Sequence, residues 1–466
     1  MSSDFALFDW FLVALYFIFL IWLSWKKGWG EDESEEQFLL SGRKVTLPAF
    51  IATLVSTWYG GILGVGEWSY QFGISQWLIL GFPFYIFSAI FAVFLAGKIR
   101  LNKALTIPEA VANQYSERAG RISALPIFIL VSPAPYILML GLIFQFLIGG
   151  DAPFLFYASL VALFSVLYIT IGGFGAVLRT DMLQVVLMFS GFILLLAFAI
   201  SEFGGFGTLF ETLPAGHLDI TGGHSLQYIL VWFFIALWTF VDPSFHQRAA
   251  AAESPETAKK GIFWSIAFWV AFDFLTCFAG MYAFAILGEG LDQPVLAYPL
   301  LADQILPVGL KGIFFLSLLA TIMSTLDSYL FISGQTLGRD YLVKYFPNVR
   351  PNLLTRIGIL VSALIGIILI IIYPSVIDLW YVIGSVFIPG LLIPVLGIYL
   401  KLFRFPARIV YASIIGCTLV SLIWLILGTI FPNAQGGYAF YGLEPFYPGL
   451  FLAILLWIYG RFRMSE

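Results

Sequence analysis

A stripe of hydroxyl side chains follows one face of the apolar segment 312–336. Its members recur at spacings of three, four or seven residues, which brings them together on a helix: Ser317, Thr321, Ser324, Thr325 and Ser328. Hard cations such as Na⁺ take oxygen ligands, and hydroxyl groups supply them without a full buried charge. The alternative is a seam of hydrogen bonds between helices. Asp327 favours the cation site, because a carboxylate inside a membrane span is costly and usually functional.

A second apolar segment, from Leu47 to about Tyr70, contains residues that interrupt helices. Its central stretch reads ATLVSTWYGGILGVG, with Gly60 and Gly61 adjacent. An interrupted helix is tolerated at membrane depth where the freed backbone lines a cavity, and freed carbonyl groups can bind a cation there. The spacing of Gly60 and Gly64 equally fits a small-residue surface for helix packing. This segment alone leaves both interpretations open.

The composition predicts a helical membrane protein with many spans. Apolar residues make up 61% of the chain and charged residues 11%, which excludes a soluble globular protein. The apolar runs are mostly about 20 residues long, the length of membrane helices rather than of barrel strands. Cys277 and Cys417 lie in separate runs, so neither a disulfide framework nor a CxxC metal motif is available.

Thirteen spans are predicted, at about 6–25, 47–73, 76–97, 122–148, 154–171, 182–201, 226–245, 262–287, 312–336, 353–373, 376–400, 408–431 and 446–460. With the N-terminus outside, every Lys and Arg except Lys311 falls in an inner loop, and these include Arg248, Lys26 and Lys27. This asymmetry agrees with the positive-inside rule. It predicts a cytoplasmic C-terminus.

Two blocks of five spans enter the membrane from opposite sides. The first span of each block is interrupted, by Gly60-Gly61 in one and by Asp242-Pro243 in the other. Such inverted repeats are typical of transporters and favour one over a membrane enzyme or a receptor. We expect a single transport domain over 1–466, divided into an N-terminal helix and loop (1–46), a first repeat (47–201), an outer loop (202–225), a second repeat (226–401) and C-terminal helices (402–466).

The chain resembles the sodium:solute symporter family, whose members share a LeuT-type inverted-repeat core. Four motifs in the family's order carry the resemblance: SGR at 41–43, GGFGAVLRTDMLQ at 172–184, DPSFHQR at 242–248 and MSTL at 323–326. It implies an all-α polytopic protein of the cell (inner) membrane that is not an enzyme and that imports a small organic solute with Na⁺ by alternating access. Expected partners are Na⁺, the solute and the bilayer, without nucleic acid and with the monomer as functional unit. A channel and a sensor are the alternatives from other classes.

The resemblance implies a main Na⁺ site where the two segments above meet. The family uses two carbonyl groups of the interrupted helix, one carbonyl group of the hydroxyl-bearing helix, and two hydroxyls one turn further on. In this sequence the corresponding residues are Leu54, Thr57, Thr321, Ser324 and Thr325. These residues coincide with the two segments that the residue types alone had indicated.

Some family members bind a second Na⁺ nearer the cytoplasm. The corresponding residues are Asp181, Asp327 and Ser328, and Asp327 replaces the family's usual hydroxyl. Two carboxylates at one site could hold Na⁺ more strongly or share a proton. In the alternative, Asp181 caps the N-terminus of the sixth span and Asp327 pairs with a cytoplasmic basic residue such as Arg339.

Two solute-binding modes of the family are disfavoured by the residues present. The galactose-type subgroup uses a Gln at the position of Gly61, together with a Glu and a Lys that the third and eighth spans lack. The Trp and Tyr of the proline-type subgroup are replaced by Ile235 and Thr239. A sugar or polyol, a carboxylate and a vitamin stay as alternative solutes.

Asp273 favours an amine-bearing, amino-acid-like solute. It lies about 16 Å into its span at 1.5 Å per residue, near the midplane of a roughly 30 Å hydrocarbon core, and its span contains no basic residue. The alternative is a protonated core residue, and the aromatic rings nearby equally fit packing. The predicted solute pocket comprises Ser56, Trp58, Tyr59, Gly60, Gly61, Tyr136, Trp238 and Asp273.

Overall fold

The computed structural model describes residues 5–25, 34–432 and 438–465. Lys26 and Lys27, counted above in an inner loop, lie outside these residues. Within the described ranges the protein is helical, and its extended pairings are two isolated bridges, Val45 with Ala252 and Phe440 with Leu443.

Ten helices in the described ranges are long and apolar enough to cross a membrane: Leu47–Phe72, Trp77–Leu101, Glu117–Ile148, Gly173–Phe203, Leu226–Ala251, Pro255–Leu287, Leu310–Lys344, Pro351–Ile372, Val376–Tyr399 and Ala407–Ile430. The shorter apolar helices Leu7–Leu23 and Phe154–Thr170, and α22 (Phe446–Ser465), occupy the other three predicted spans. The all-helical membrane fold is confirmed, whereas the count of thirteen spans stays a prediction.

The first interrupted helix narrows into a 3₁₀ turn at its glycine pair. α3 (Leu47–Trp58) passes through η2 (Tyr59–Gly61) into α4 (Ile62–Phe72). Both glycines allow a close approach by another helix. A Cβ on Gly60 would overlap the Thr325 side chain, and a Cβ on Gly61 would overlap the Trp380 indole.

The second interrupted helix is broken by an extended residue. α13 (Leu226–Ile235) and α14 (Trp238–Val241) lead to Asp242, whose backbone (φ −70°, ψ 113°) separates them from α15 (Pro243–Ala251). Pro243 has no N–H to continue the helix, and the Asp242 carboxylate accepts the Ser244 N–H at 2.7 Å as the N-cap of α15. The break predicted at Asp242-Pro243 is therefore present.

The loop predicted at 172–181, between the fifth and sixth spans, is wrong, because α10 (Phe154–Phe203) runs through these residues. The two spans meet at Gly173, whose backbone is non-helical (φ 56°, ψ −161°) and where a Cβ would meet the Phe38 ring at 2.6 Å. The helix resumes at once, so Asp181 lies about two turns inside it. The alternative that Asp181 caps the sixth span is therefore wrong.

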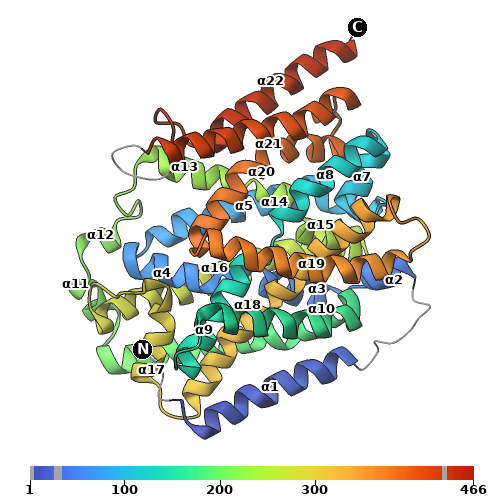
Figure 1. Cartoon of the computed structure of the whole chain (residues 1–466). Helices are drawn as coiled ribbons and strands as arrows, with labels where there is room; N and C mark the ends of the chain where they lie inside the picture. Colours follow the sequence, from blue (N-terminus) through green and yellow to red (C-terminus); the bar gives the residue numbers. More distant parts are fainter. Residues whose placement is uncertain (1–4, 26–33, 433–437, 466) are drawn as a thin grey trace.

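α18 (Leu310–Gln335), which carries the hydroxyl stripe, is a central helix of the described chain. α10 packs along it, and α3, α9 (Ala134–Ile148) and α1 (Leu7–Trp25) also contact it. Nearly all of its side chains are buried. Figure 1 shows α1 along one edge of the protein, and α21 (Ala407–Ile430) and α22 along the opposite edge.

The remaining α-helices are α2 (Glu35–Leu40), α5 (Phe82–Phe91), α6 (Gly97–Leu101), α7 (Ile107–Gln114), α8 (Glu117–Leu130), α11 (Phe206–Thr212), α12 (Ala215–Leu218), α16 (Pro255–Leu287), α17 (Ala297–Ile305), α19 (Pro351–Ile372) and α20 (Val376–Tyr399). Within the described ranges, a π-helical turn at Trp77–Gly81 leads into α5, another at Ala92–Ala96 joins α5 to α6, and a third at Thr336–Tyr341 continues α18.

Candidate cation and solute sites

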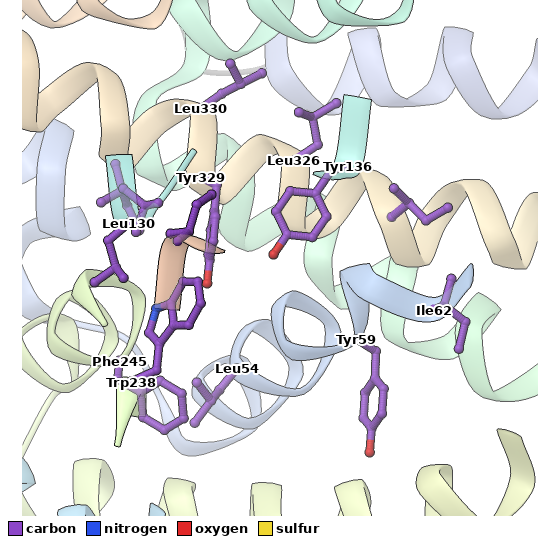
Figure 2. Packing of buried hydrophobic residues seen from close by; sticks show 14 of the residues in the cluster. Leu54, Tyr59, Ile62, Leu130, Tyr136, Trp238, Phe245, Leu326, Tyr329 and Leu330 are labelled. Carbon is purple, nitrogen blue, oxygen red and sulfur yellow. The ribbon is translucent and has the colours of Figure 1, made fainter. Parts of the chain in front are cut away.

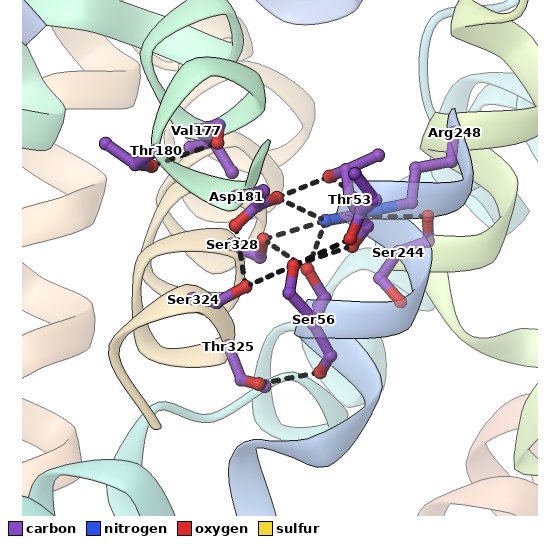
Figure 3. A network of polar contacts seen from close by, with 12 residues as sticks. Thr53, Ser56, Val177, Thr180, Asp181, Ser244, Arg248, Ser324, Thr325 and Ser328 are labelled. Atoms are coloured by element: carbon purple, nitrogen blue, oxygen red, sulfur yellow. Dashed lines mark hydrogen bonds and ion pairs between the residues drawn. The ribbon is translucent and has the colours of Figure 1, made fainter. Parts of the chain in front are cut away.

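Two groups predicted for the main Na⁺ site are in contact where α18 meets α3. The Thr325 hydroxyl donates a hydrogen bond to the Thr57 carbonyl at 2.7 Å (Figure 3). Leu54 and Thr321 lie about one turn earlier on the same two helices. Gly60 allows this contact, because any side chain there would overlap Thr325.

Ser324, the other predicted hydroxyl ligand, bonds to Asp181. Its Oγ donates to Asp181 Oδ1 at 2.6 Å and lies 2.9 Å from Ser56 Oγ. The Thr53 hydroxyl donates to the second oxygen of the same carboxylate. Ser56 therefore belongs to this polar network rather than to the solute pocket for which it was predicted.

Arg248 lies inside this network, and its assignment to an inner loop is wrong. Its side chain is fully buried, and Nη2 lies 3.7 Å from Asp181 Oδ2. It donates hydrogen bonds to three hydroxyls and one carbonyl: Thr57 Oγ1 at 2.5 Å, Ser328 Oγ at 2.9 Å, Thr53 Oγ1 at 3.2 Å and the Ser244 carbonyl at 3.3 Å. Figure 3 shows the side chain reaching from α15 into the space between α3, α10 and α18.

Asp327 was predicted to share a site with Asp181 of α10. It bonds instead to Tyr168, which lies earlier in the same helix. Its Oδ2 accepts a hydrogen bond from the Tyr168 hydroxyl, and its buried Oδ1 has no hydrogen-bond partner within the described ranges. The alternative pairing with Arg339 is wrong. Arg339 instead forms ion pairs with three other carboxylates: Glu35 at 2.8 Å, Asp340 at 3.0 Å and Glu109 at 3.1 Å.

A cavity of about 110 Å³ lies next to the two interrupted helices. Six of the predicted pocket residues line it: Trp58, Tyr59, Gly61, Tyr136, Trp238 and Asp273. The other two, Ser56 and Gly60, do not line it, because both face α18. Figure 2 shows six side chains that line the cavity: Leu54, Tyr59, Tyr136, Trp238, Phe245 and Tyr329.

Two carboxylates and no basic side chain are among the described residues that line this cavity. Asp273 accepts a hydrogen bond from the Tyr85 hydroxyl and is 3% exposed. Asp242, besides capping α15, has its second oxygen 3.4 Å from the Tyr329 hydroxyl. The cavity therefore presents two carboxyl groups, without a basic side chain among its described lining residues, to whatever enters it.

Gln76 and Asp242 are polar lining residues that the sequence interpretation missed. Gln76 is fully buried, and neither polar atom of its amide has a hydrogen-bond partner in the described part of the chain. An unpaired buried amide is costly unless a ligand or water completes it. Asp242 was interpreted as a helix break and as part of the DPSFHQR motif, although a carboxylate at such a break within the membrane is itself a signal of a functional site.

A family model and several curated relatives match this chain. A family model described as the sodium:solute symporter family matches residues 38–406. The osmoregulated proline transporter OpuE of Bacillus subtilis is 26% identical over 89% of this chain and 88% of its own. A sodium/glucose cotransporter of Vibrio parahaemolyticus is 25% identical over 75% and 72%, and the high-affinity choline transporter 1 of Drosophila melanogaster is 25% identical over 79% and 63%.

Solved structures match the fold over almost the whole length. A substrate-bound, outward-open Na⁺-coupled sialic acid symporter has a TM-score of 0.76, with 16% identity, over 98% of this chain and 97% of its own. The nucleobase-cation-symport transporter Mhp1 in a closed conformation has a TM-score of 0.60, with 16% identity, over 91% and 93%. At such identities the likeness concerns the fold alone.

Proposed function

Because the chain belongs to the sodium:solute symporter family, we propose that it imports a small solute carrying a positively charged nitrogen together with Na⁺. Na⁺ is the coupling ion, and the family consists of transporters rather than enzymes. The observation that carries the choice of solute is the cavity with Asp242 and Asp273 and no basic side chain among the described residues that line it.

The size and lining of the cavity support this solute class. At roughly 10–15 Å³ per water, a volume of about 110 Å³ accommodates a molecule the size of a small amino acid or amine. Aromatic rings on several sides, including Trp58, Trp238 and Tyr136, suit a cation, because a ring face attracts positive charge. Two relatives are named as transporters of proline and of choline, and both solutes carry a positively charged nitrogen.

Uptake by the purified protein in liposomes tests the proposal. Choline and other amines should accumulate under an inward Na⁺ gradient, and counterflow should occur, as expected of a carrier and not of a channel. Proline belongs in the same panel, although Ile235 and Thr239 replace the binding residues of the proline-type subgroup. A panel with a sugar, a polyol, a carboxylate and a vitamin tests the alternative solutes. Accumulation of one of these, with none of the amines, would contradict the proposal.

The topology and the monomeric unit are part of the same proposal. The protein is a polytopic membrane protein. We retain the outer N-terminus, the cytoplasmic C-terminus, the domain limits given above and function as a monomer. Arg248 no longer counts among the inner-loop charges, and Arg179 lies within α10 rather than in a loop, so the proposed orientation rests on the other basic residues.

The main Na⁺ site is proposed at Leu54, Thr57, Thr321, Ser324 and Thr325. Replacing Ser324 and Thr325 together with Ala should raise the Na⁺ concentration for half-maximal uptake by more than about tenfold. Each substitution removes one oxygen contact to the ion, and such a contact should be worth at least an ordinary hydrogen bond, about 1 kcal/mol. Thr321→Val is the matched control, because its hydroxyl bonds to the Ser317 carbonyl and only its own carbonyl is a proposed ligand. Unchanged Na⁺ activation in the double variant would disprove the assignment.

Asp327 is proposed to bind a proton or a cation apart from the main site. A buried carboxyl group without a basic partner needs one or the other. Uptake at fixed Na⁺ should vary with pH in the native protein and vary less in Asp327→Asn. Tyr168→Phe keeps the carboxyl group and should keep the pH dependence. Superimposable pH profiles of the native protein and Asp327→Asn would leave Asp327 with a purely structural role.

A further inference from the structure

We propose that an anionic phospholipid binds at one end of the C-terminal helices α21 and α22. Six basic side chains form the binding surface, which we call the C-terminal basic surface: Arg118, Lys401, Arg404, Arg408, Arg461 and Arg463. They come from the start of α8, the segment between α20 and α21, the start of α21 and the end of α22. The inference does not depend on the solute or the Na⁺ sites proposed above.

Packing between the helices brings these side chains to the same end of the protein. The Trp457 indole of α22 donates a hydrogen bond to the Leu402 carbonyl, just after α20, at 3.1 Å. The Arg118 guanidinium of α8 lies over the Tyr411 ring of α21, 4.4 Å from its centroid. Figure 1 shows α21 and α22 side by side along one edge of the molecule.

Carboxylates do not neutralise this surface. The sequence contains no Asp or Glu at 379–443 or 445–465, and Glu444 lies at the opposite end of α22, where it accepts a hydrogen bond from Tyr381. Within the described ranges none of the six basic residues forms an ion pair, whereas Arg43 and Arg339 elsewhere do. Unneutralised positive charge at a membrane surface attracts anionic lipid.

Neutral groups hold two of the guanidinium groups in place. Arg404 donates from Nε to the Gly397 carbonyl at 3.1 Å and from Nη2 to the Ile398 carbonyl at 3.3 Å. Arg118 donates from Nη2 to the Tyr411 hydroxyl at 3.3 Å. These acceptors fix the orientation and leave the positive charge in place, and a guanidinium has five N–H donors with which to bind a phosphate.

The other cations and the neighbouring apolar face suit the rest of the lipid. Lys401, Arg408 and Arg461 are exposed and have no hydrogen-bond or ion-pair partner in the part of the chain that the structure describes. Exposed apolar side chains continue from them along the two helices: Leu419, Ile423, Ile426, Phe451, Leu455 and Phe462. A phosphate group beside the cations would therefore have its acyl chains along this face, which favours a phospholipid over free phosphate.

Melting temperatures of the purified protein in detergent, titrated with phosphatidylglycerol or phosphatidylcholine, test the inference. Phosphatidylglycerol should stabilise the native protein more than phosphatidylcholine does. Replacing Lys401, Arg408 and Arg461 together with Gln should weaken the apparent affinity for phosphatidylglycerol roughly 100-fold, since each basic residue near an anionic lipid contributes about fivefold. These side chains have no partner in the described structure, so the melting temperature without lipid should stay near the native value.

The matched control replaces Lys344, Arg350 and Arg356 with Gln, because these exposed residues carry the same charge in another inner loop. The control should keep the native affinity for phosphatidylglycerol, and inorganic phosphate should not compete with the lipid. If the first triple variant does not fold, Arg408→Gln alone should lose about fivefold.

Three outcomes would overturn the inference. The first is native affinity in the folded Lys401, Arg408 and Arg461 variant, or in Arg408→Gln where that variant decides. The second is an equal loss in the control, because charge anywhere on the protein would then suffice. The third is equal stabilisation of the native protein by both lipids, or competition by inorganic phosphate. Equal stabilisation is the result expected if these residues serve only to orient the helices during insertion.

Discussion

Replacing Asp273 with Asn is expected to weaken solute binding roughly 10- to 150-fold while leaving Na⁺ activation unchanged. A hydrogen bond to a charged group contributes about 1.5–3 kcal/mol, and about 1.4 kcal/mol is a tenfold change in affinity. Asp273 lines the cavity and is almost fully buried, so its charge is little screened by water. Asn keeps the shape of the side chain and removes the charge that the amine would meet.

Tyr85→Phe provides the matched control for Asp273→Asn. It removes the hydroxyl that bonds to Asp273 and keeps the carboxyl group, so solute affinity should change little. The measurement is the shift of melting temperature with increasing choline, or with the amine that the uptake panel identifies, at saturating Na⁺. If Asp273 only packs as a neutral core residue, Asp273→Asn lowers the melting temperature itself but leaves the apparent affinity unchanged. Equal affinities would therefore end the assignment of Asp273 to the solute.

The helices were predictable because membrane spans are long apolar runs, which need no knowledge of tertiary contacts. The error at 172–181 shows the limit of that reasoning. Gly173 and the polar run that ends at Asp181 have the composition of a loop, but the structure continues the helix. Thr53 and Ser324, from α3 and α18, satisfy the Asp181 carboxylate there, so polarity did not mean exposure to water.

Arg248 was missed for a related reason. The positive-inside rule counts the basic residues in each loop, and it assigns a residue to a loop when the local sequence is polar. Its position was decided instead by residues distant in sequence, Asp181 and Ser328. A usable signal was present, because a buried Asp181 requires a positive partner and the sequence offers Arg248 shortly after the predicted break at Asp242-Pro243.

The rotation of α3 decided which of its residues line the cavity. Ser56 and Gly60 are four residues apart and therefore share a face, and that face lies against α18. Trp58 and Gly61 lie on the face toward the cavity. The sequence predicted the segment and its break, but the packing partner that fixes the rotation, α18, comes from the other repeat.

Gly60 and Gly61 are expected to separate Na⁺ binding from solute binding when each is changed to Ala. A Cβ at Gly60 would overlap Thr325, whose hydroxyl bonds to the Thr57 carbonyl, so Gly60→Ala should raise the Na⁺ requirement more than about tenfold or abolish Na⁺-driven uptake. Overpacking a tight contact costs about 1–3 kcal/mol. Ala also favours a helix over Gly by about 1 kcal/mol, so loss of helix propensity does not explain the effect.

Gly61→Ala is the matched variant, because the added methyl group is the same and the position is adjacent. Its Cβ would overlap the Trp380 indole, which lines the solute cavity, so solute affinity should fall while Na⁺ activation stays near the native value. The measurement is a pair of titrations of uptake, one of Na⁺ at saturating solute and one of solute at saturating Na⁺. Native Na⁺ activation in Gly60→Ala, or the same defect in both variants, would contradict the assignment of one face of this turn to the cation and the other to the solute.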